Sequence, residues 1–156
     1  MRNKQKGFSL IELLIVVAII LIIAAIAIPN LLRSKMAANE ASAVGSVRTL
    51  NTACVTYSTT YGGYPGALTN LGPAATATST TADLVDSVLA SGTKSGYSFT
   101  YVSGTTDNNG NVLGYSITAN PVTTGTTGQR SFFSDQSGVI RGNPSATATV
   151  ASTPLG

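Results

Sequence analysis

Residues 8–28 read FSLIELLIVVAIILIIAAIAI, and this stretch decides the fold. Its 21 positions hold one charged residue, Glu12, and neither glycine nor proline. A helix of this length is about 31 Å long and matches the ~30 Å hydrocarbon core of a bilayer. The sequence therefore predicts a membrane-spanning helix over residues 8–29, closed by Pro29.

The charges are placed asymmetrically around this helix. Three of the nine basic residues, Arg2, Lys4 and Lys6, precede it, and the remaining six balance the six acidic residues. The isoelectric point near 9.2 thus reflects a short basic terminus, and a nucleic-acid-binding face has no electrostatic support. By the positive-inside rule, we expect residues 1–7 in the cytoplasm and the rest of a single-pass chain outside.

Two simpler interpretations compete for this segment. A secretory signal peptide also has a basic start and an apolar run, and cleavage after Ala27 fits its small-residue pattern. The run is longer than usual, however, and it contains Glu12. An inert anchor explains the length but not the carboxylate, which costs ~2.5 kcal/mol or more near the bilayer centre. Glu12 therefore requires a partner.

The sequence GFSLIE at residues 7–12, followed by the apolar run to Pro29, resembles the processing signature of type IV prepilins and type II secretion pseudopilins. The resemblance implies that residues 1–7 are a leader peptide. A prepilin peptidase would cut between Gly7 and Phe8 and N-methylate Phe8. An inner-membrane assembly platform and its ATPase would then pull the helix from the lipid into a homo-oligomeric helical filament.

Physical chemistry agrees with this implication. Cleavage after Gly7 removes all three leading cations and leaves one α-ammonium on Phe8. That cation and Glu12 are then the only charges of the apolar segment, and in a low-dielectric helical bundle they attract each other between neighbouring subunits. We therefore expect Phe8, Glu12 and Pro29 to matter for assembly.

A second helical stretch follows Pro29, which predicts a kink or local melting near residues 25–29. Residues 30–61 carry one amphipathic stripe at helical spacing, which predicts a long helix packed under a head domain. The stripe consists of Leu32, Met36, Glu40, Val44, Val47, Leu50, Cys54, Tyr57 and Tyr61.

Residues 62–142 are expected to form an αβ-loop and an antiparallel sheet. Glycines at 62 and 63 end the helix, and a short helix is expected at 82–91, capped by Thr80 or Thr81. The Thr-rich run at 76–81 is read as a solvated linker, with O-linked sugar as the alternative. From Tyr97 onward, apolar residues recur at every second position. This spacing predicts three or four strands around residues 97–101, 115–117, 130–134 and 139–141. The tail at 143–156 shows no pattern, and we expect it to be disordered or loosely packed. The fold class is α+β.

The residue types argue against an enzyme. With no His, no Trp and one Cys, the chain can build neither a Ser-His-Asp or Cys-His nucleophile, nor a His-based metal cage, nor an internal disulfide. Cys54 is read as a small buried hydrophobe, and Asp83 and Asp86 as a solvated helix face. Asp107 begins DNNGN, which favours a tight turn over a calcium site. We expect no cofactor, metal or catalytic residue.

The leading hypothesis is therefore a structural subunit of a type IV pilus-like filament. The alternative is the major pseudopilin of a type II secretion system, and a secreted binding module released after Ala27 is the third. The first two imply an inner-membrane subunit that ends in a surface pilus or a periplasmic pseudopilus. No motif indicates what the filament adheres to, or whether the chain is a major or a minor component of it.

Overall fold

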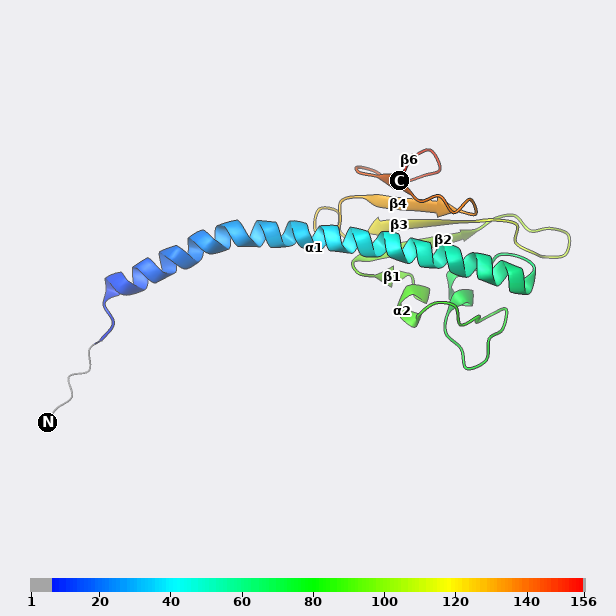
Figure 1. Cartoon of the computed structure of the whole chain (residues 1–156), viewed down its shortest axis with the longest axis horizontal. Coiled ribbons are helices and arrows are strands. Elements are labelled where there is room, and N and C mark those ends of the chain that lie inside the picture. The colour runs from blue at the N-terminus through cyan, green and yellow to red at the C-terminus, as the bar shows by residue number, and fades with distance from the viewer. Residues whose placement is uncertain (1–6, 156) are drawn as a thin grey trace. The chain divides into compact units, whose positions relative to one another are not determined.

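The computed structural model describes residues 7–155, so most of the expected leader lies outside the described residues. Helix α1 runs from Leu10 to Tyr61 (Figure 1). The chain divides into two compact units, Met1–Lys35 and Met36–Gly156, and their boundary falls within α1. The predicted long amino-terminal helix is confirmed.

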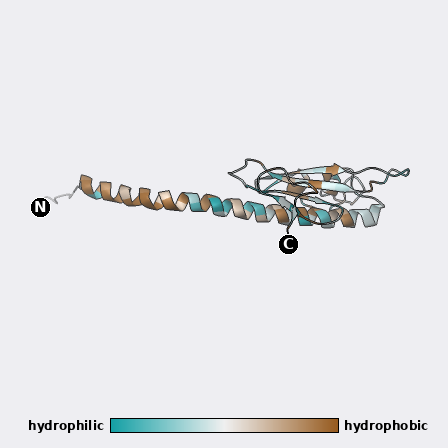
Figure 2. Cartoon of the chain, turned by 90° about the horizontal axis from the view of Figure 1, so that it is seen from above, coloured by the Kyte–Doolittle hydropathy of each residue, from teal (hydrophilic) through white to brown (hydrophobic). Residues whose placement is uncertain are grey.

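The first part of α1 is apolar, and none of its residues is buried by the described part of the chain. Its large side chains are exposed, from 45% for Val17 to 77% for Leu10. An 18-residue window of α1 has a mean hydropathy of 3.3 and is 0% buried, so length and composition suffice to cross a membrane (Figure 2). This surface needs either lipid or another protein around it.

Pro29 lies inside α1, which stays helical on both sides of it. The expected local melting at residues 25–29 is therefore wrong for this structure. A proline removes one hydrogen bond from the helical ladder, and the helical residues on either side hold the backbone in place.

In the second unit, one face of α1 packs on a sheet. The stripe is buried at Val47, Leu50, Cys54 and Tyr57, whereas Leu32 stays half exposed at 50%. Tyr57 also donates a hydrogen bond to the carbonyl of Ser79 at 2.6 Å, which ties the Thr-rich loop to the helix. The predicted helix-on-sheet packing is confirmed.

The sheet is a six-stranded antiparallel meander in the order β1–β6. Tyr97, Phe99, Ile117 and Phe132 are buried. In β2, the buried Tyr97 and Phe99 alternate with exposed residues, as the period of two predicted. Strands β1 and β6 were not predicted, because two residues are too few to show a period. The strands are β1 (Thr93–Lys94), β2 (Tyr97–Ser103), β3 (Tyr115–Pro121), β4 (Ser131–Asp135), β5 (Arg141–Asn143) and β6 (Thr153–Pro154).

The predicted helix at 82–91 is wrong in length and cap. Helix α2 covers only Ser87–Ala90, and its cap is Asp86, which accepts a hydrogen bond from the Leu89 N–H. Residues 82–85 cannot join it, because their N–H groups bond to carbonyls of residues 70–72 near a 3-10 turn, η1 (Leu68–Leu71). Asp86 also pairs with Lys94 at 2.8 Å. Asp83 and Asp86 therefore lie on a loop and a cap rather than along one helix face.

Residues 143–155 of the tail are ordered, so the expected disorder or loose packing is wrong for them. Strand β6 pairs with β5, Ala148 is 2% exposed, and the Ser131 hydroxyl donates to the carbonyl of Ala146. Tertiary hydrogen bonds and one buried alanine fix a segment that has no periodicity of its own.

Candidate functional site

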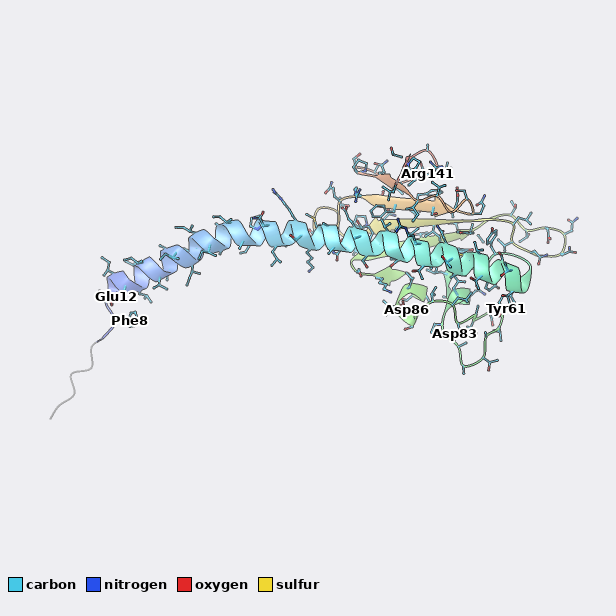
Figure 3. All side chains as sticks on the ribbon, viewed as in Figure 1. Phe8, Glu12, Tyr61, Asp83, Asp86 and Arg141 are labelled. Carbon is cyan, nitrogen blue, oxygen red and sulfur yellow. The ribbon has the colours of Figure 1, made fainter. Side chains whose placement is uncertain are left out.

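The expected cleavage site lies just before the start of α1. Gly7, Phe8 and Ser9 precede the helix and adopt no regular secondary structure. Phe8 is 84% exposed (Figure 3), and a β-carbon added at Gly7 would meet no described atom within 4 Å other than its chain neighbours. A peptidase binds its substrate in an extended form, so the bond between Gly7 and Phe8 is accessible without unwinding the helix.

Glu12 lies in the first turn of α1, where its Oε2 accepts a hydrogen bond from the Ser9 N–H at 2.8 Å. This is the reciprocal half of a capping box, in which a glutamate at the third helical position satisfies an N–H that the helix leaves free. The negative charge also faces the positive end of the helix dipole. The spacing S-x-x-E at residues 9–12 carries this signal, and the sequence reading did not use it.

The capping geometry bears on assembly. Glu12 uses one oxygen within its own chain, and no bond to the other oxygen is formed within residues 7–155. An α-ammonium on Phe8 would lie beside the positive helix end, which is unfavourable unless a carboxylate is near. One oxygen of Glu12 can therefore cap the start of its own helix, while the second oxygen can bind a cation from another copy of the chain.

Glu40 is a functional contact that sequence reasoning missed, since it was counted only as a stripe position. Its carboxylate is 12% exposed and lies 2.8 Å from Arg130 Nε. It also accepts hydrogen bonds from the N–H groups of Gln129 and Arg130 at 2.9 and 3.1 Å. Burial alone would raise the pKa of Glu40, but these bonds and the Arg130 charge hold it below its usual value. The β3–β4 loop is thereby fastened to α1, beyond the apolar segment.

We expect Glu40→Gln to lower the free energy of unfolding of the head by about 1–2 kcal/mol at neutral pH. Because the folded pKa lies below the unfolded one, this stabilisation is present above the unfolded pKa and is lost as pH falls through the folded value. Denaturant unfolding from pH 7 into the acid range, followed by tyrosine fluorescence, measures both effects. The gap between wild type and variant should close in acid. A gap that stays constant would show that the charge of Glu40 is not responsible.

The remaining candidate residues have structural tasks. The Asp107 carboxylate accepts hydrogen bonds from the N–H groups of Asn109 and Asn111, both at 2.8 Å, and so organises the turn. Cys54 is fully buried, and burial raises its thiol pKa to about 12, which makes it unreactive. Within residues 7–155 no group of three or more Cys, Asp or Glu side chains could hold a metal ion.

Comparison with known proteins identifies the amino-terminal segment. Residues 2–28 match the model of the prokaryotic N-terminal methylation motif. In this segment the chain is similar to type IV pilins and type II secretion pseudopilins. The type IV wide pilus major component PilA4 of Thermus thermophilus is 65% identical over 40 residues, which are 26% of this chain and 30% of that protein.

Two further relatives extend this comparison. The type IV major fimbrial protein FimA of Dichelobacter nodosus is 50% identical over 58 residues, which are 35% of this chain and 37% of that protein. The type II secretion system core protein G of Escherichia coli is 35% identical over 63 residues, which are 40% of this chain and 43% of that protein. The pilin-like chain thus spans less than half the length of these relatives. No solved structure matches it.

Proposed function

We propose that this pilin-like chain is a structural subunit that polymerises into a type IV pilus-like filament after a prepilin peptidase cuts between Gly7 and Phe8. One observation carries the proposal: an apolar helical segment with a methylation motif is wholly exposed, yet it continues into a folded head. Water cannot be its final environment. Lipid covers it before assembly, and other copies of the same segment cover it afterwards.

Assembly in this proposal pairs the charges at the start of α1. Glu12 meets the Phe8 ammonium of a neighbouring subunit, and an isolated charge in lipid becomes a paired one. The pair gives register to a surface that is otherwise uniformly apolar. The prepilin peptidase, the inner-membrane platform and its ATPase are the expected partners, and the chain itself performs no catalytic step.

The subunit would begin as a single-pass protein of the inner membrane with its head outside. Cleavage after Gly7 removes the three cations that oppose extraction through the bilayer. The major pseudopilin of a type II secretion system remains the second candidate, favoured by the similarity to core protein G. Filaments on the cell surface, as opposed to periplasmic ones, distinguish the two.

Gly7→Val is expected to accumulate uncut protein in the membrane and to abolish filaments, because a β-branched side chain hinders close approach of the peptidase to the backbone. In the wild type, electron microscopy of sheared filaments and mass spectrometry of their subunit should find a first residue Phe8 carrying a methyl group. A native chain that begins at Ile28 would instead support the secreted module and overturn the proposal.

A further inference from the structure

The carboxylates of the chain are nearly all engaged by their own subunit. Of the six acidic residues, Glu12, Glu40, Asp86, Asp107 and Asp135 each accept at least one hydrogen bond. Asp83 is the exception: within residues 7–155 it accepts no hydrogen bond and belongs to neither ion pair. Its side chain is exposed on the loop between η1 and α2 (Figure 3).

Hydrogen bonds hold the backbone at Asp83 in place. The N–H of Asp83 donates to the carbonyl of Gly72 at 2.9 Å, and its neighbours Ala82 and Leu84 donate to Asn70 and Leu71 at 2.7 and 3.0 Å. Asp83 itself has a φ of +53°, a left-handed conformation that few residue types other than glycine, asparagine and aspartate adopt readily. The loop therefore carries its negative charge on an ordered backbone, and within residues 7–155 the carboxylate accepts no hydrogen bond.

The cations without a partner lie on a different element. Lys94 and Arg130 form the two ion pairs, and Arg141 donates to the carbonyl of Ser152. The cations that have no such contact within residues 7–155 are exposed along α1, namely Arg33, Lys35 and Arg48. Within residues 7–155, the cations without such contacts thus lie on the helix, and the carboxylate that accepts no hydrogen bond lies on a loop of the head.

Arg33 and Lys35 have a particular need of a counter-charge. No acidic residue lies between Glu12 and Glu40, and Glu40 is already bound to Arg130. The two cations directly follow the apolar segment that the proposed function places among other copies. They project from α1 about 200° apart, so one of them faces a neighbour on almost any side.

We propose that the Asp83 carboxylate binds the Arg33–Lys35 cations of a second copy of this chain. The inference rests on the proposed function, because only an assembly of copies brings the head loop of one subunit to the helix of another. Complementary charge sets the register between the head loop of one subunit and the helix of the other, and partial exclusion of water from the contact strengthens it.

Asp83→Asn tests the contact, because asparagine tolerates the same left-handed backbone and removes only the charge. Full-length filaments are sheared from cells, held at low or high NaCl and sedimented. At low salt, the unassembled fraction should rise about two- to fivefold over wild type. The control Asp135→Asn changes net charge equally, at a carboxylate that already accepts the Ser137 N–H, and should behave as wild type. High salt should bring wild type to the level of Asp83→Asn.

A second set of variants identifies the partner. Changing both Arg33 and Lys35 to Gln should reproduce the Asp83→Asn effect, and adding Asp83→Asn to that pair should cause little further loss, since both remove one contact. Arg48→Gln should add its effect independently. If Asp83→Asn filaments sediment as wild-type filaments do at low salt, the inference is overturned. It is also overturned if the loss caused by Asp83→Asn adds fully to the loss caused by the Arg33 and Lys35 changes. Wild-type cells without any filaments overturn the proposed function instead.

Discussion

Glu12→Val should leave expression, membrane insertion and cleavage after Gly7 largely intact and yet reduce the filament fraction about tenfold or more. A change of ~1.4 kcal/mol per subunit already shifts an equilibrium tenfold. Removing one partner of a buried charge pair costs more, about 3–5 kcal/mol, because the other charge is left uncompensated. The measurement compares processed subunit in the membrane with subunit in the sheared filament fraction. Normal filament yield from Glu12→Val would show that Glu12 does not drive assembly.

Glu12→Gln separates the two tasks of this side chain. The amide oxygen of glutamine can still accept the hydrogen bond that the Ser9 N–H gives to Glu12, so the start of α1 stays capped while the charge is lost. If pairing with the Phe8 ammonium drives assembly, Glu12→Gln should fail as Glu12→Val does. If Glu12→Gln assembles normally, capping is the task of Glu12. Ser9→Ala is a matched control, since it keeps both the charge and the backbone N–H.

The sequence allowed the prediction of features that have a period or a strong composition. The apolar segment, the helical spacing from Met36 to Tyr61 and the alternation in β2 all persist over several turns or residues, so they are visible without tertiary context. The amino-terminal site is equally local, because GFSLIE at residues 7–12 combines a cleavage point with the start of the apolar segment. The capping pair at Ser9 and Glu12 is also local, but it was not predicted.

Features that depend on distant residues were not visible. Glu40 and Arg130 are far apart in sequence, and only the folded head shows that a stripe position is an ion pair. Strand β6 has two residues and exists because β5 offers an open edge. The loop at 82–85 looked helical because its apolar residues have helical spacing, but hydrogen bonds to residues 70–72 hold it in another conformation. In each case a tertiary contact overrides local propensity.

Gly128→Ala should lower the free energy of unfolding of the head by about 3 kcal/mol, the upper range for overpacking a well-filled core. A β-carbon at Gly128 would lie 2.1 Å from the hydroxyl oxygen of Tyr97 and 2.7–2.8 Å from its ring. Tyr97 cannot move aside, because it is 0% exposed and its hydroxyl donates to the Arg130 carbonyl at 2.7 Å. Displacing this ring would also disturb the loop that holds Glu40.

Guanidinium unfolding of the full chain in detergent micelles measures this effect, and tyrosine fluorescence reports it because the protein has no tryptophan. Gly66→Ala is the matched control, since a β-carbon there meets nothing within 4 Å. The control should stay within about 0.5 kcal/mol of wild type or gain slightly, through lower entropy of the unfolded chain. Equal midpoints for Gly128→Ala and Gly66→Ala would contradict the tight packing of Tyr97. Filament yield should follow the same order, because a subunit with a destabilised head is degraded before it can assemble.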